Sequence, residues 1–351
     1  MSIDRELIVS VAQLRDPDGI VSIYVDIDPA EAASTHPRWI EDVRVELGRL
    51  ECTERLHELR HRIEDLLDPT QHGRGRALFF GVMPAGPVRS FAVQMPLETS
   101  VTMSDRARLQ PLLEAMDAGR PAGIVIVSMT ELRAIELAWG EAAEVVRVDV
   151  APPPAEWSLR KEPTHLHAED RLHIVRSAAP QVEELARRRG WDRIVLAGNP
   201  RLTRPLAAKL AGRVDATVVE AMRQVLPEDH AAHVASQLTL HVADAGARQA
   251  AARLDQAQNA AFAGGAGAAG VDDVLAALTE GRARWVAIDG DAPLHASGAQ
   301  DSGSVVGLLE RVDVAPMIIE RAFATGADVS VLSGRSHPQL AEASALALLR
   351  W

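Results

Sequence analysis

The first third of the chain alternates between β-branched apolar runs and a long stretch with helical spacing. Residues 20–27, IVSIYVDI, are typical of a buried strand. Leucines and an isoleucine then recur at helical spacing from about Arg38 to Leu67, where Asp68-Pro69 predicts the end of a helix. Two more strands are expected at 77–82 and 88–95, followed by a short helix at 106–118.

The middle of the chain begins after a boundary at Gly119-Arg120-Pro121 and also combines strands with helices. Three strands come first, and Ala151-Pro152-Pro153-Pro154 then predicts an extended arm, because proline cannot donate to a sheet. Residues 155–169 are polar and basic without a clear period, which predicts a long exposed loop. We expect strands at 124–128, 132–138, 144–150, 194–197 and 217–219, and helices at 169–189, 204–211 and 227–260. In the first of these helices Leu172, Val175, Val182 and Leu185 form the expected apolar face, and Pro180 predicts a kink.

The last part of the chain follows a glycine-rich run at Gly264–Gly270, which we interpret as a hinge. Helices and strands alternate again, which predicts a small α/β sandwich. We therefore expect an α/β protein with an N-terminal domain at 1–119, a central domain at 120–262 with an exposed loop at 151–169, and a C-terminal domain at 271–351. The C-terminal elements are expected at 272–278, 285–288, 315–324, 328–332 and about 346–351.

The charge and the cysteine content of the chain exclude some classes of function. A formal net charge of −12 argues against a general nucleic-acid coat. Positive charge nevertheless concentrates between Trp157 and Arg213, where twelve Arg or Lys stand against six Asp or Glu. The single cysteine, Cys52, excludes a disulfide framework and favours a reducing compartment.

Neither a secretory signal nor a long apolar span is evident in the sequence. We therefore expect a cytoplasmic protein that binds no membrane.

Cofactor and metal motifs are weak. Gly265-Ala-Gly267-Ala-Ala-Gly270 has the spacing of a dinucleotide-binding loop, but such a loop must follow a strand and here a long helix is expected before it. His165, His167 and His173 lie close in sequence without a cysteine or carboxylate at ligand spacing, so no metal site is expected. We expect no bound cofactor.

The segment around Trp157 carries the most informative side chains. It contains one aromatic residue, which can stack on a base, and several cations, which can pair with phosphates. The alternative is a solvated basic loop whose tryptophan packs on its own domain. The candidate RNA-binding residues are Trp157, Arg160, Lys161, His165, His167, Arg171 and Arg176.

Several segments together resemble the archaeal and eukaryotic-type peptide chain release factor and Pelota family, in its bacterial branch. They are WDRIVLAGNPRLTRPLAAKL in the middle of the chain, and GVDDVLAALTEGRARWVAI, MIIERAFATGADVSVLSG and SALALLRW near its end. The resemblance implies a central domain of the release-factor middle-domain type and a C-terminal L7Ae-like α/β sandwich.

The residues that cut peptidyl-tRNA in true release factors are missing. Their Gly-Gly-Gln loop corresponds to about Trp157–Glu169, which contains neither Gly nor Gln. Gly298-Ala299-Gln300 lies in the third predicted domain, and the stop-codon motifs of the family's N-terminal domain are absent. Codon-directed termination is therefore not expected.

The resemblance implies a tRNA-mimicking, ribosome-associated factor that acts at the A-site region in hibernation or rescue, similar to Balon-type hibernation factors, which also lack the glutamine motif. Its expected partners are large-subunit rRNA and an elongation factor, with no DNA. Two alternatives stay open. One is a peptidyl-tRNA hydrolase similar to the Vms-type factors, with His165 or His167 as general base. The other is a cytosolic protein-interaction module that retains only the fold.

Overall fold

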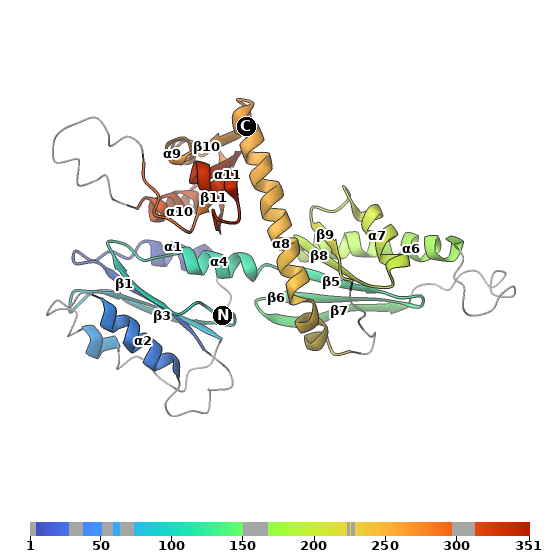
Figure 1. Ribbon diagram of the computed structural model, residues 1–351, viewed down its shortest axis with the longest axis horizontal. Coiled ribbons are helices and arrows are strands. Elements are labelled where there is room, and N and C mark those ends of the chain that lie inside the picture. The colour runs from blue at the N-terminus through green and yellow to red at the C-terminus, as the bar shows by residue number, and fades with distance from the viewer. Residues whose placement is uncertain are drawn as a thin grey trace. The chain divides into compact units, whose positions relative to one another are not determined.

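The computed structural model describes residues 5–27, 38–50, 59–63, 74–149, 168–222, 225, 229–296 and 313–351. The chain divides into two compact units. The first unit combines Met1–Asp117 with Arg253–Trp351, and the second unit is Ala118–Ala252. The described residues form three sheets that are covered by helices, which confirms the predicted mixed α/β class (Figure 1). The three predicted domain boundaries remain predictions.

An antiparallel four-stranded sheet forms the N-terminal part of the first unit. Helix α2 (Arg38–Arg49) buries Trp39, Val43 and Leu47 against one face of this sheet. On the other face Tyr24 and Phe79 meet edge to face, with ring centroids 5.8 Å apart. Helix α4 (Gln110–Ala118) follows the sheet. The strand order is β3 (Val88–Val93), β2 (Gly75–Gly81), β1 (Ile20–Asp26), β4 (Ser100–Ser104).

The second unit is a five-stranded mixed sheet between two helical layers. Helices α6 (Ala168–Arg189) and α7 (Pro200–Leu210) pack on one face, and helix α8 (Ala231–Phe262) packs on the other. Strand β5 pairs with its two neighbours in opposite senses, antiparallel to β6 and parallel to β8. The order is β7 (Glu141–Asp149), β6 (Glu131–Ala138), β5 (Ala122–Val127), β8 (Arg193–Gly198), β9 (Thr217–Glu220).

The C-terminal part of the first unit has its own four-stranded sheet. Its buried strands read as continuous apolar runs because both faces are covered. The last turns of α8 and helix α11 (Pro338–Ala343) pack against one face through Leu254, Ala257 and Leu340. The strand order is β10 (Gly267–Ala269), β13 (Ala345–Leu349), β11 (Ala283–Asp289), β12 (Asp328–Leu332), and the remaining helices are α9 (Val271–Thr279) and α10 (Ala315–Ala324).

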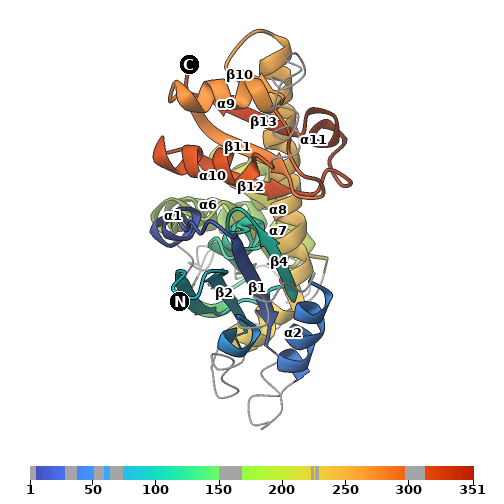
Figure 2. The same cartoon turned by 90° about the vertical axis from the view of Figure 1, so that its left-hand side faces the viewer.

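The N-terminal helix α1 (Arg5–Ala12) joins the two parts of the first unit by packing against α10 (Figure 2). The Arg5 guanidinium lies over the Phe323 ring, 5.1 Å from its centroid. Glu320 on α10 accepts from both Arg15, at 3.1 Å, and Arg106, at 2.9 Å. These contacts come from both ends of the chain.

The predicted helix from Arg38 to Leu67 is wrong as a single element. Helix α2 ends at Arg49 and Leu50 lies in a bend, while residues 59–63 are helical again. Gly48 lies at the end of α2, and glycine lowers the helical preference there. Residues 51–58 and 64–67 lie outside the described part of the chain.

The apolar face predicted for the helix at 169–189 is also partly wrong. Leu172 is 47% exposed, whereas Val175 and Val182 are buried. The buried face includes Ile174, Ala178 and Ala179. Two of these are alanines, which the search for large apolar residues at helical spacing did not detect.

The hinge predicted at Gly264–Gly270 is a strand in part. Residues Gly267–Ala269 form β10, which pairs antiparallel with β13. A Cβ on Gly267 would lie 2.4 Å from the backbone nitrogen of Ala261, so glycine is needed there for close packing. Helices α1 and α11 and strand β4 were not predicted.

Candidate RNA interface of the second unit

Five of the seven predicted RNA-binding residues lie outside the described part of the chain: Trp157, Arg160, Lys161, His165 and His167. The other two, Arg171 and Arg176, lie on α6. Arg176 is exposed and Arg171 is half-buried. The structure therefore describes only the helical end of the predicted interface.

Helices α6 and α7 form one layer because their apolar faces share a core. Val182 from α6 and Leu206 from α7 are fully buried in the same cluster as Leu196 of the sheet. Helix α7 starts with Pro200 after Asn199, whose side chain accepts a hydrogen bond from the backbone of Arg201 at 2.9 Å. Burial of the inner faces leaves the polar residues of both helices on the outside.

The outside of this layer is rich in basic residues. Between Ala168 and Arg213 the sequence has ten Arg or Lys and five Asp or Glu. Some of these cations are neutralised locally. Glu184 accepts from Arg187 and Arg188, Arg213 pairs with Glu183 at 3.0 Å, and Arg189 lies 3.6 Å from Glu136.

Glu184 shows this neutralisation in its titration. Hydrogen bonds from Arg187, and then from Arg188, hold the pKa of its carboxyl below the usual range. Glu184 thus stays ionised and keeps these two guanidinium groups engaged at neutral pH.

Five cations of the layer have no such partner. We call them the basic layer: Arg171, Arg176, Arg201, Arg204 and Lys209. Within the described ranges, none of their side chains makes a hydrogen bond or an ion pair. Arg176, Arg201 and Arg204 are exposed, so their donors are available to an anionic partner. The candidate list from the sequence missed Arg201, Arg204 and Lys209, although the positive segment up to Arg213 included all three.

The rest of the second unit carries a different balance of charge. On α8, across the sheet, Arg248 pairs with Asp244 at 2.9 Å. On β6 and β7, Arg133 and Arg147 pair with Glu144, and Arg147 also lies 3.5 Å from Glu131. Among the cations of the second unit that the structure describes, those without a partner therefore lie on the α6–α7 layer.

The third histidine of the predicted trio, His173, lies on α6 beside the start of the layer. Its Nε2 atom is buried and has no hydrogen-bond partner among the residues that the structure describes. No cluster of metal-ligating side chains is found in the described ranges either. Among the helices of the described part, none is long and apolar enough to cross a membrane.

Several known proteins show a distant similarity to this chain. An uncharacterized Bacillus subtilis protein, YocB, is 23% identical over 212 residues, which cover 53% of this chain and 80% of YocB. Among solved structures, Archaeoglobus fulgidus Pelota is 11% identical with a TM-score of 0.41, covering 100% of this chain and 93% of that one. Yeast Dom34 (S. cerevisiae) is 9% identical with the same TM-score, covering 100% and 92%. Likenesses this distant carry no argument about function.

The family comparison is more specific. Residues 108–259, which include the whole second unit, match the family described as Bacterial archaeo-eukaryotic release factor family 10. This match confirms the resemblance found in the sequence, because residues 108–259 of the chain are similar to a bacterial family related to the archaeal and eukaryotic release factors.

Proposed function

We propose that this protein is a ribosome-associated translation factor that binds large-subunit rRNA at the A-site region, in hibernation or rescue. The observation that carries the proposal is the basic layer of the second unit, within the segment that matches a release factor family. Cations without partners on one face of an acidic protein attract RNA phosphates and orient its approach.

The proposed role does not include release-factor chemistry. The chain contains no Gly-Gly-Gln, so the amide that positions water in true release factors is missing. The segment from Trp157 to His167 would extend the contact of the basic layer by stacking and phosphate pairing. An elongation factor is a further expected partner.

Co-sedimentation with ribosomes from stationary-phase cells tests this function. At low salt the protein should travel with 70S and 50S particles. Replacing Arg171, Arg176, Arg201 and Arg204 together by alanine should release it into the soluble fraction. The matched control is Arg248→Ala on α8, which removes one exposed cation across the sheet and should leave binding unchanged. Absence of the unmodified protein from both ribosomal fractions would exclude the proposal.

The same material distinguishes the hydrolase alternative. Peptidyl-tRNA bound to purified 50S subunits should remain intact with the protein in excess. Release that disappears in His165→Ala or His167→Ala would replace our proposal with an enzymatic one. A protein-interaction module, by contrast, would show no salt-dependent binding to RNA.

A further inference from the structure

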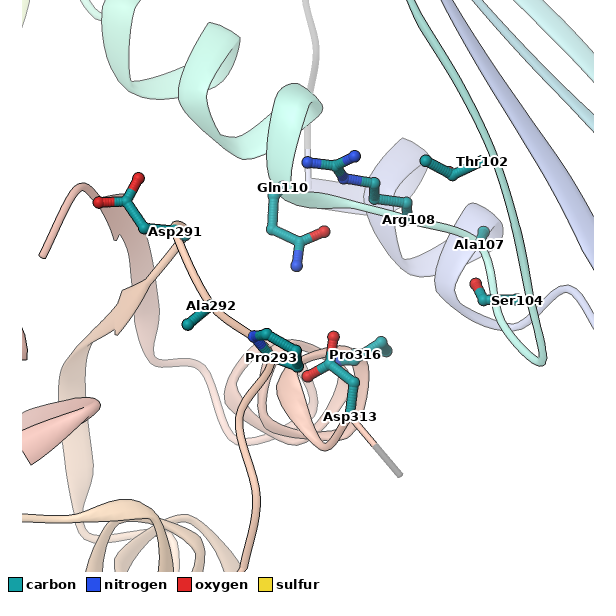
Figure 3. A pocket seen from close by; sticks show the side chains of 11 residues that line it. Thr102, Ser104, Ala107, Arg108, Gln110, Asp291, Ala292, Pro293, Asp313 and Pro316 are labelled. Carbon is teal, nitrogen blue, oxygen red and sulfur yellow. The ribbon is translucent and has the colours of Figure 1, made fainter. Parts of the chain in front are cut away.

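A second feature, unrelated to the basic layer, is a cavity of about 290 Å³ in the first unit (Figure 3). Ligand-binding pockets begin at about this size. One wall comes from residues 102–110 at the end of the N-terminal sheet, and the other comes from residues 290–293 with Asp313 and Pro316 beside the C-terminal sheet. A molecule bound there would touch both parts of the unit.

Charge is divided between the two walls. Arg108 and the Gln110 amide belong to the N-terminal wall, together with the Ser104 hydroxyl. Both carboxylates of the lining, Asp291 and Asp313, belong to the opposite wall. The cavity therefore has a cationic side and an anionic side.

Arg108 is fixed by its backbone, and its charge acts on the nearby Glu114 carboxyl. Its backbone nitrogen donates to the Oγ of buried Ser22 at 3.0 Å, and its carbonyl accepts from the hydroxyl of buried Tyr24. The half-buried guanidinium makes no hydrogen bond or ion pair with any residue in the described ranges. Arginine has five N–H donors, so such a group is prepared for a ligand that accepts hydrogen bonds.

In each carboxylate of the opposite wall, one oxygen accepts hydrogen bonds from the protein. One Asp313 oxygen, Oδ1, accepts from the backbone nitrogens of Leu294 and Ala315, at 3.1 and 2.9 Å. One Asp291 oxygen, Oδ2, accepts from Ser333 and from the Arg335 backbone. The second oxygen of each accepts from no described residue. These contacts hold both side chains in place and leave an oxygen of each for a donor.

We propose that this cavity binds a small zwitterion whose carboxylate and ammonium are separated by several atoms, the chemistry of a dipeptide. The carboxylate pairs with Arg108 and the ammonium lies against Asp313 and Asp291. The Gln110 amide in the lining offers both a donor and an acceptor for the polar bond between the two ends, while the Ser104 hydroxyl donates to the carbonyl of Arg106 and can still accept. A simple anion leaves Asp313 without a cation, whereas Asp291 already lies 3.9 Å from the Arg335 guanidinium. A simple cation leaves the N–H donors of Arg108 without an acceptor. The inference does not depend on the ribosomal function.

Isothermal titration of the full chain with L-alanyl-L-alanine tests the proposal. The dipeptide should bind, and both N-acetyl-alanyl-alanine and alanyl-alanine amide should bind roughly tenfold or more weakly, because each lacks one charge. Equal binding of the capped peptides, or no binding of the free dipeptide at millimolar concentration, overturns the proposal.

Two substitutions assign the charges to the walls. Arg108→Gln should weaken the free dipeptide roughly tenfold and leave the amide-capped peptide unaffected, because that peptide has no carboxylate. Asp313→Asn should weaken the free dipeptide while leaving the acetylated peptide unaffected. Asparagine also caps a helix well, so the contacts with Leu294 and Ala315 survive this change.

The matched control is Arg89→Gln, which removes an exposed arginine from β3, outside the lining of the cavity. Dipeptide binding that is unchanged in both Arg108→Gln and Asp313→Asn, with far-UV circular dichroism showing folded protein, would refute the site.

Discussion

At Gly267, within a glycine-rich run, close packing leaves no room for a side chain. The run has the spacing of a dinucleotide-binding loop, yet its middle glycine belongs to β10 and lies against the end of α8. A Cβ there would meet the carbonyl oxygen of Ala257 at 2.6 Å as well as the nitrogen of Ala261. Gly265, two residues earlier, has ordinary van der Waals space, with its nearest contact at 3.4 Å.

We therefore expect Gly267→Ala to destabilise the protein by about 1–3 kcal/mol, the usual cost of forcing an extra methyl into packed structure. Gly265→Ala is the matched control and should change stability by less than about 0.5 kcal/mol. Urea unfolding followed by circular dichroism measures both. Equal effects of the two substitutions would show that space does not determine the glycine at 267.

Glu114 on α4 carries an unfavourable charge. Partial burial raises the pKa of its carboxyl, and the negative charges of Glu98 and Asp291 add to this, while Arg108 opposes it. The folded protein therefore holds this proton more tightly than the unfolded chain does. The resulting stabilisation is complete below the ordinary pKa of a glutamate and is lost as pH rises through the raised value.

Glu114→Gln should consequently be more stable than the unmodified protein at neutral pH and no more stable at about pH 4. Because the side chain is partly exposed, the gain at neutral pH should stay below about 1 kcal/mol. Thermal unfolding across this pH range measures it. A difference that does not change with pH would rule out an effect of charge.

Helices α6 and α7 together place many of the arginines of this segment on one exposed layer. Packing of their alanine and leucine faces on the sheet leaves the basic layer outside, while Glu183 and Glu184 engage Arg213, Arg187 and Arg188. The two classes of cation should therefore contribute differently to RNA binding.

Affinity for rRNA should fall steeply with salt, because phosphate contacts release counterions. Arg176→Ala should reduce the slope of log K against log salt by about 1, whereas Arg187→Ala should reduce it less, since Glu184 already engages that guanidinium. Filter binding at several salt concentrations gives both slopes. An equal loss for both arginines would mean that the ion pairs with Glu184 do not limit binding.

At the scale of the molecule, the two ends of the chain meet in the first unit. Glu320 accepts from Arg15 and Arg106, while Arg5 covers Phe323 and donates to the carbonyl of Ala327. One carboxylate thus neutralises two arginines that come from the N-terminal part of the chain.

Glu320→Gln should lower the stability of the protein by about 1 kcal/mol, because two partly exposed ion pairs are lost and two arginines remain close together. Glu280→Gln is the control, since it removes a single pair with Arg282, a close neighbour in sequence. Urea unfolding compares them. A loss for Glu280→Gln as large as that for Glu320→Gln would contradict a joining role for Glu320.

The α/β class of the fold and the likeness of residues 108–259 to a release factor family could both be recognised from the sequence. Strands such as β1 and β12 were predictable because burial on both faces demands continuous apolar residues, and α10 was predictable from its periodicity. Helix α1 and strand β4 were not predicted, because short and partly polar elements are stabilised mainly by the elements on which they pack. The excess of arginine before Arg213 was visible in the sequence too.

Which of those arginines have a carboxylate partner depends on how the helices and strands pack together. Arg213 and Arg189 find Glu183 and Glu136, whereas Arg176, Arg201 and Arg204 find no described partner, and nothing in local spacing distinguishes these groups. The cavity could not be predicted either, because its walls come from segments far apart in sequence. Local patterns record which face of an element is buried, but ion pairs and cavities depend on which elements meet.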